Sequence, residues 1–266
     1  MIQGRLFGSL SFRPNVAGLV TLTACVLAWE MAIRAGAIQY QYLPAPSAIA
    51  FGAGELIASG ELLDATLHTL ESVFLGWAAA VGAGLSLGLV LGSSPLLQRY
   101  TLATIEVLRP MPAIAFVPVA LLLFGFSMET ELTVIILPSL WPVLINTMGG
   151  LREVHARLSD VGRTFRLSHA AILCKVMLPA STPAIMVGAR VSLTLALVLA
   201  VLAEMVGNPA GLGYAVIAQQ QALRPDLMFV YVVVIGLLGL MLNVVLVGAA
   251  SLCFPAAAAA LKGRRL

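Results

Sequence analysis

The feature that most constrains this chain is a series of six long apolar runs. They cover residues 16–33, 73–91, 108–126, 132–148, 185–206 and 228–254. A helix that spans the hydrocarbon core of a bilayer needs about 20 mostly apolar residues. Only 10% of the residues are charged, whereas about a quarter are charged in soluble domains. The sequence therefore predicts an all-α membrane protein with six transmembrane helices, in a single domain covering residues 1–266.

The first run has the flanks of a membrane anchor. Arg5 and Arg13 precede it, as basic residues precede the apolar part of a signal peptide. However, the run is long enough to span, and it ends in Trp29, Glu30 and Arg34 instead of small residues suited to cleavage. We expect this run to be retained in the membrane.

Basic residues predict the orientation of the spans. With the N-terminus inside, 12 of the 15 basic residues fall on the cytoplasmic side, as the positive-inside rule requires. They are Arg5, Arg13, Arg99, Arg152, Arg157, Arg163, Arg166, Lys175, Arg190, Lys262, Arg264 and Arg265. Arg34 and Arg224 fall outside, and Arg109 lies at or within the third span. We therefore expect both termini and the stretch at 152–179 to lie in the cytoplasm.

The longest polar interruption between apolar runs is residues 154–179. Its apolar residues recur at spacings of four, three and four, which predicts one face of a helix; they are Val154, Leu158, Val161 and Phe165. Ser168 is placed to cap a second helix, at 170–177, which Pro179 ends. Two interpretations fit this pattern: a docking element for a soluble partner, or helices held on the membrane surface by anionic lipids.

A proline-rich segment follows the first span on the outer side. It reads Leu43-Pro44-Ala45-Pro46-Ser47, and its prolines favour an extended backbone. Ser47 is placed to cap an amphipathic helix, whose apolar residues are Ile49, Phe51, Leu56 and Ile57. We expect this helix to lie in the outer membrane interface.

Three glycines in the second run, Gly84, Gly88 and Gly92, recur every four residues. They form a flat stripe that allows another helix to approach closely. The partner helix belongs either to the same bundle or to a second copy of the chain, and we favour the same bundle.

Candidate gate or path residues come from two segments that break helices. The first contains three prolines at 110, 112 and 118, and it either borders a substrate path or holds an interfacial Glu106–Arg109 pair, which we favour. The second combines an acid with a glycine-rich turn and a glutamine-rich helix near the outer face. The candidates are Arg109, Pro112, Glu204, Gly211, Gly213 and Gln219.

The sequence carries no pattern that predicts catalysis or a cofactor on this chain. There is no Gly-rich loop with Lys-Ser/Thr for ATP phosphates. The three histidines, His68, His155 and His169, and the three cysteines, Cys25, Cys174 and Cys253, show no metal-ligand spacing. The net charge of +3 comes from residues at membrane edges, so we expect no nucleic-acid partner.

The polar stretch resembles the E-A-A-x-x-x-G…I-x-x-L-P signature of bacterial ABC importer permeases, with Asp160-Val161-Gly162 and Leu178-Pro179 at the matching positions. Further motifs resemble the nitrate/sulfonate/taurine subfamily. They are Trp29-Glu30, Leu43-Pro44-Ala45-Pro46-Ser47, Arg109-Pro110-Met111-Pro112, Phe124-Gly125, Ala203-Glu204 and Gly211-Leu212-Gly213-Tyr214. Arg166 stands where the signature has Gly, which costs roughly 1 kcal/mol in a left-handed turn.

The resemblance implies a type I ABC importer permease fold, a place in the bacterial inner membrane and a set of partners. Two copies of an ATPase subunit would hold ATP and Mg, and the permease would pair with a second permease copy. A periplasmic or lipid-anchored solute-binding protein would deliver a small anionic solute such as a sulfonate, nitrate, bicarbonate or carboxylate. The implied ATPase-coupling residues are Arg157, Asp160, Val161, Gly162, Phe165, Arg166, Leu178 and Pro179.

Two alternatives to an importer subunit stay open on the residues alone. An ion-coupled secondary transporter usually shows ionisable residues in mid-span and inverted repeats, and this sequence shows neither pattern. A membrane scaffold without transport activity is compatible with the composition. Uptake that depends on an ATPase indicates an importer, uptake that does not indicates a secondary transporter, and no uptake indicates a scaffold.

Overall fold

The computed structural model describes residues 16–38, 40–164 and 168–253. Within these ranges every regular element is helical. The bounds are α1 Val16–Arg34, α2 Pro46–Ser59, α3 Glu61–Gly92, α4 Pro95–Leu108, η1 Ala113–Phe116, α5 Val117–Phe124, α6 Met128–Thr164, α7 His169–Ile172, η2 Leu173–Met177, α8 Leu178–Gly207, α9 Gly211–Gln221 and α10 Pro225–Cys253.

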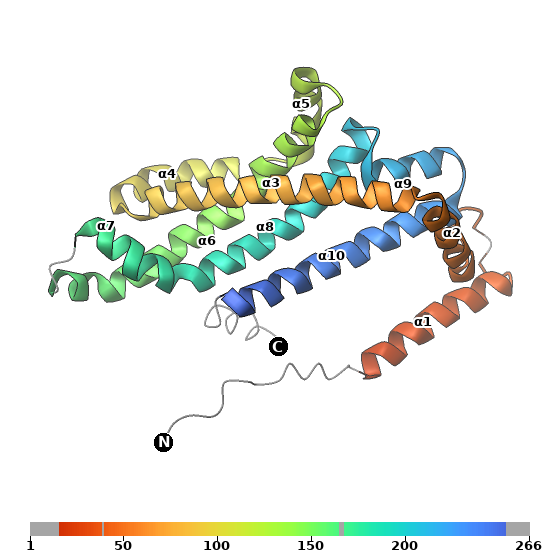
Figure 1. Cartoon of the computed structure of the whole chain (residues 1–266), viewed down its shortest axis with the longest axis horizontal. Coiled ribbons are helices and arrows are strands. Elements are labelled where there is room, and N and C mark those ends of the chain that lie inside the picture. The colour runs from red at the N-terminus through yellow and green to blue at the C-terminus, as the bar shows by residue number, and fades with distance from the viewer. Residues whose placement is uncertain (1–15, 39, 165–167, 254–266) are drawn as a thin grey trace.

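Three long helices, α3, α6 and α8, form the centre of the bundle (Figure 1). The helix α10 runs beside them, and α1 lies apart at the periphery (Figure 1). Helices α2 and α9 lie at one end of the bundle and α7 lies at the opposite end (Figure 1). We call these the α9 end and the α7 end.

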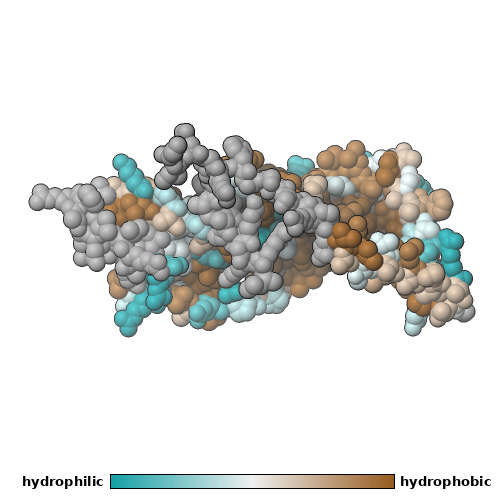
Figure 2. All heavy atoms as spheres, turned by 90° about the horizontal axis from the view of Figure 1, so that it is seen from below, coloured by the Kyte–Doolittle hydropathy of each residue, from teal (hydrophilic) through white to brown (hydrophobic). Residues whose placement is uncertain are grey.

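Five helices are long and apolar enough to cross a membrane, or six spans if the bent pair of α4 with η1–α5 counts as one. This agrees with the six spans expected. Figure 2 shows apolar residues gathered on the right half of the visible face, with hydrophilic residues at both ends and along part of the lower edge. Exposed apolar side chains such as Leu122 and Leu240 suit contact with lipid.

The predicted third span at 108–126 covers a break between helices, as its prolines indicated. Leu108 ends α4, and the chain then turns by 82° before continuing through η1 into α5. Pro110 and Pro112 lack backbone N–H donors, so the helix cannot continue through this segment. Pro118 is accommodated in the first turn of α5, where its N–H is not required.

The helix α6 continues past the membrane into the stretch that we expected to hold a separate helix. It runs 37 residues, from Met128 to Thr164. The predicted span at 132–148 lies within this helix. Val154, Leu158 and Val161 lie on the last turns of α6, and Phe165 lies outside the described residues.

The second predicted helix begins as expected but does not end at Pro179. Ser168 Oγ accepts a hydrogen bond from Ala171 N at 3.3 Å, which is the predicted cap. Pro179 then falls in the first turn of α8, directly after the π-helical segment η2. Because Pro179 has no N–H, the helix loses one backbone bond there, and the wider π turn accommodates the loss.

The glycine stripe of α3 packs within the bundle, as we favoured. A Cβ atom on Gly84 would lie 2.7 Å from Leu140 O, and one on Gly88 would lie 2.7 Å from Thr147 Cβ. Gly92 faces Met148 and Leu151 in the same way. The absence of side chains on this face of α3 therefore permits its close contact with α6.

The helix α2 forms where predicted, but Ser47 does not cap it. Ala45 occupies the cap position and makes no side-chain cap bond. Ser47 instead donates from Oγ to Glu30 Oε1 at 2.8 Å, and its N–H donates to Glu30 Oε2 at 2.9 Å. A carboxylate from the last turn of α1 thus takes the role expected of the serine hydroxyl.

Candidate functional site

Glu204 joins the end of α8 to the start of α9. It lies three residues before the end of α8 and is 1% exposed. Its Oε2 accepts a hydrogen bond from Gly213 N at 2.8 Å. The N-terminus of a helix carries free N–H groups and the positive end of the helix dipole, so it favours this carboxylate.

The glycines of the turn leave room for that carboxylate. Gly211 has a φ of +86°, which side-chain-bearing residues rarely adopt. A Cβ atom there would collide with the carboxylate of Glu204, and one on Gly213 would collide with the carbonyl oxygen of Val201. The structure thus brings together three of the predicted gate residues, Glu204, Gly211 and Gly213.

Three further polar residues, His68, Glu131 and Asn208, complete a cluster that the sequence did not reveal. His68 Nε2 of α3 lies 3.0 Å from Glu131 Oε1 of α6. Asn208 Nδ2 donates to the same oxygen. Ligand-type atoms of His68, Glu131 and Glu204 all lie within 4.8 Å of one another. Because 63 residues separate His68 from Glu131, their spacing in the sequence gave no signal of a shared site.

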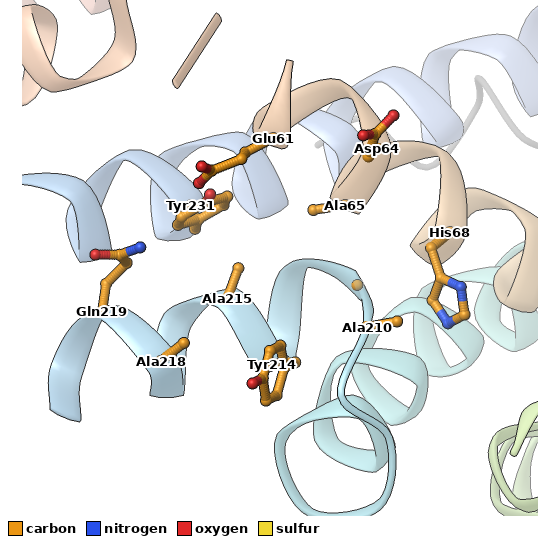
Figure 3. A pocket seen from close by; sticks show the side chains of 11 residues that line it. Glu61, Asp64, Ala65, His68, Ala210, Tyr214, Ala215, Ala218, Gln219 and Tyr231 are labelled. Carbon is orange, nitrogen blue, oxygen red and sulfur yellow. The ribbon is translucent and has the colours of Figure 1, made fainter. Parts of the chain in front are cut away.

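A cavity of about 420 Å³ borders this cluster at the α9 end. In Figure 3, residues of α3 lie along one side of it and residues of α9 along the other. Glu61, Asp64 and His68 come from α3, and the predicted Gln219 comes from α9. None of the residues that line the cavity is Lys or Arg. Its charge therefore suits a cation better than an anion.

Arg109 and Pro112 lie elsewhere. Both are exposed at the bend between α4 and η1, and neither lines the cavity beside Glu204. The structure therefore does not bring these two predicted path residues to the cluster.

Arg190 lies inside α8, not in a cytoplasmic loop as we expected. It is 12 residues from Leu178, or about 18 Å along the helix at 1.5 Å per residue. Its Nε donates to Asn243 Oδ1 of α10 at 2.7 Å. Among the residues that the structure describes, no acidic side chain pairs with it. Apolar residues continue the helix on both sides of Arg190, with Val187 and Ala189 before it and Val191 and Leu193 after it.

A cavity of about 100 Å³ lies beside Arg190 and Asn243. Thr194 and Gly239 also line it, together with leucines of α8 and α10. Ionisable residues within membrane spans usually face protein or a polar path. Arg190 is therefore a candidate path residue that the sequence analysis missed.

An ion pair outside the spans ties α2 to the turn before α10. Arg224 donates two hydrogen bonds to the carboxylate of Glu55, each 3.0 Å long, and a third to Asp226. The Arg224 hydrogen bonds lower the pKa of Glu55. The same carboxylates raise the pKa of Arg224.

The predicted coupling residues lie at the α7 end. Arg157, Asp160, Val161 and Gly162 are on the last turns of α6, and Leu178 and Pro179 begin α8. Phe165 and Arg166 lie outside the described residues, and so does the expected effect of Arg166 on the turn.

The chain is similar to known transport proteins over most of its length. Residues 80–256 match the family described as "binding-protein-dependent transport system inner membrane component". A Bacillus subtilis protein named as an aliphatic sulfonates transport permease, SsuC, is 31% identical over 222 residues, covering 84% of this chain and 80% of that protein.

Two further relatives are similar over a shorter part of this chain. The nitrate import permease protein NrtB of Leptolyngbya laminosa is 30% identical, over 66% of this chain and 63% of that protein. The bicarbonate transport system permease protein CmpB of Synechococcus elongatus is 32% identical, over 67% of this chain and 64% of that protein. Together with the helical bundle, these similarities show that the chain belongs to the inner-membrane permeases of binding-protein-dependent ABC importers, in the nitrate and sulfonate group.

Proposed function

We propose that this chain forms the translocation path of an ATP-driven importer for a small anion, and that residues 152–179 couple it to an ATPase subunit. The observation that carries the proposal is the continuity of α6 and α8. Helix α6 contains residues 152–164, and α8 begins at Leu178, both at the α7 end. The same two helices carry Glu131 and Glu204 at the α9 end.

The length of these helices supports a mechanical role. The 37 residues of α6 extend about 55 Å at 1.5 Å per residue, well beyond a hydrocarbon core of about 30 Å. The segment from Leu173 to Gly207 adds 35 helical residues in α8 and η2. A displacement of the 152–179 stretch would therefore be transmitted along both helices to the α9 end, in a two-state transition of alternating access.

The partners follow from the family. The importer would contain two copies of an ATPase subunit, which hold ATP and Mg, and a second permease copy. A periplasmic or lipid-anchored binding protein would deliver the solute to the α9 end. Both termini of the chain and the α7 end would then lie in the cytoplasm, as the basic residues predict.

The anionic nature of the solute is supported by two independent facts. The relatives are named for sulfonates, nitrate and bicarbonate. In addition, Arg190 supplies a positive charge within a span, with the neutral Asn243 as its partner. A guanidinium binds oxyanions well because its N–H donors form a planar fork.

Co-purification tests the coupling role. The chain is tagged, expressed with its ATPase subunit and captured from detergent, and uptake is measured in parallel. We expect Asp160→Lys and Val161→Asp to lose the ATPase and abolish uptake while the chain still inserts in the membrane. Ser93→Lys serves as the control, because Ser93 is exposed near the same end and outside the coupling stretch. Wild-type uptake in both coupling variants would refute the docking role.

A further inference from the structure

We propose that His68, Glu131 and Glu204 form a binding site for a divalent transition-metal ion, with Zn²⁺ as the best fit. The three side chains come from three different helices, α3, α6 and α8. The inference does not depend on the proposed function, because it concerns an ion bound by this chain alone.

The spacing of the ligand atoms is close to that of a metal site. One atom from each residue lies within 4.8 Å of the other two. Ligands of a tetrahedral zinc ion at about 2.1 Å lie roughly 3.4 Å apart.

Two carboxylate oxygens in the cluster have no hydrogen-bond donor among the described residues. They are Glu131 Oε2 and Glu204 Oε1, and both are buried. Thr69 lies close to Glu204, but its hydroxyl donates to Ala65 O at 3.1 Å. Buried carboxylate oxygens without partners are costly, and a cation is the partner that both would share.

The charge balance also favours a divalent ion. Glu131 and Glu204 are 0% and 1% exposed, and two ionised carboxylates so close together repel each other. One protonated imidazole would neutralise only one of them. A divalent cation with a neutral imidazole balances both charges and uses all three side chains as ligands.

The donor types indicate which metals fit. Imidazole nitrogen suits zinc and other first-row transition ions, whereas magnesium and calcium prefer sites made only of oxygen. Asn208 donates to Glu131, and such a contact orients a ligating carboxylate. Three protein ligands leave one position for water or an exchangeable ligand.

An entry route is present. His68 lines the cavity of about 420 Å³ together with Glu61 and Asp64. Acidic residues at its wall raise the local concentration of cations. A bound ion would tie α3, α6 and α8 together at the α9 end, opposite the 152–179 stretch.

Metal titration of the whole chain in lipid nanodiscs tests the site. After chelator treatment, Zn²⁺ is added and the bound metal is counted by mass spectrometry and calorimetry. We expect one Zn²⁺ per chain, and at least tenfold weaker binding in each of His68→Ala, Glu131→Gln and Glu204→Gln. Metal affinity should be unchanged in the controls Glu71→Gln and Glu129→Gln, which change exposed acids of α3 and α6.

X-ray absorption of the zinc-loaded wild-type chain gives a second readout that does not depend on whether variants fold. One imidazole with oxygen ligands near 2.0–2.2 Å is the expected first shell. Sulfur ligands would place the zinc on cysteine and overturn the proposal. So would the absence of stoichiometric Zn²⁺ in the wild type, or full affinity retained in the folded glutamine variants.

Discussion

At the scale of residues, two buried or half-buried carboxylates each accept hydrogen bonds from the first turn of a later helix. Glu30 of α1 accepts hydrogen bonds from Ser47 of α2, and Glu204 of α8 accepts one from Gly213 of α9. Both pairs join short motifs that the sequence analysis had recognised separately. The acid motif and the proline- or glycine-rich motif after it are therefore two halves of one contact.

The Glu204 contact predicts a strict requirement for glycine at 213. An added methyl group would collide with Val201 O, and overpacking of this kind costs about 1–3 kcal/mol. We expect Gly213→Ala to lower the melting temperature of the purified chain by several degrees. Gly236→Ala in α10 is the control, because nothing lies within 4 Å of an added Cβ there. Equal melting temperatures for the two variants would show that this contact does not contribute to the stability of the chain.

Arg190 carries a prediction about the solute. We expect Arg190→Gln to reduce ATP-driven anion uptake at least tenfold while the ATPase still co-purifies, because only the charge in the path is lost. Arg99→Gln, an exposed arginine of α4, should leave uptake unchanged. Uptake in Arg190→Gln at the wild-type rate would mean that this guanidinium serves packing alone.

Some contacts between single residues could be predicted from the sequence, and others could not. Glu204, Gly211 and Gly213 lie within ten positions, so their meeting was predictable from a turn. His68 and Glu131 meet only because α3 packs on α6, and that depends on tertiary packing. Arg190 was assigned to the cytoplasm because the positive-inside rule treats a buried arginine like one in a loop.

At the scale of elements, the α3–α6 contact depends on glycine. The stripe at Gly84, Gly88 and Gly92 was visible as a four-residue spacing, and its partner in the same bundle was correctly favoured. The prolines at 110 and 112 predicted the break after Leu108, whereas the extension of α6 to Thr164 was missed. Hydropathy marks where lipid contact ends, whereas a helix continues as long as its backbone hydrogen bonds can form.

Gly88→Ala tests the α3–α6 contact. The new methyl group would lie 2.7 Å from Thr147 Cβ, so we expect the free energy of unfolding to fall by about 1–3 kcal/mol. Gly82→Ala, on the open side of the same helix, should instead be neutral or stabilising by up to about 1 kcal/mol. Denaturation in mixed micelles measures both. A stable Gly88→Ala variant would place α6 farther from α3 than described.

The Glu55–Arg224 pair predicts a pH dependence at the α9 end. Its hydrogen bonds lower the pKa of Glu55 in the folded state. The pair therefore contributes stability above the pKa of the unfolded chain, and this contribution is lost as the pH falls through the lower folded pKa. Glu55→Gln should lower the melting temperature slightly at pH 7 and by less as the pH is lowered toward 3. The effect is small because both side chains are exposed. A difference that grows in acid would contradict this sign.

At the scale of the whole molecule, the central helices place two kinds of polar group at opposite ends. The basic 152–179 stretch lies at the α7 end, and the buried cluster of His68, Glu131 and Glu204 lies at the α9 end. Helices α6 and α8 each carry residues of both groups. In the proposed importer, this arrangement would let a separate ATPase at the α7 end drive changes at the α9 end. It was predictable only in outline from apolar runs and charge.

Reconstitution tests the central claim most directly. The chain, its ATPase subunit and its binding protein are placed in proteoliposomes, and uptake of a labelled small anion is followed with and without ATP. The account predicts uptake that requires ATP and the ATPase, that stops with Val161→Asp, and that persists when ion gradients are collapsed. Uptake that proceeds without the ATPase and follows an ion gradient would contradict it and establish a secondary transporter.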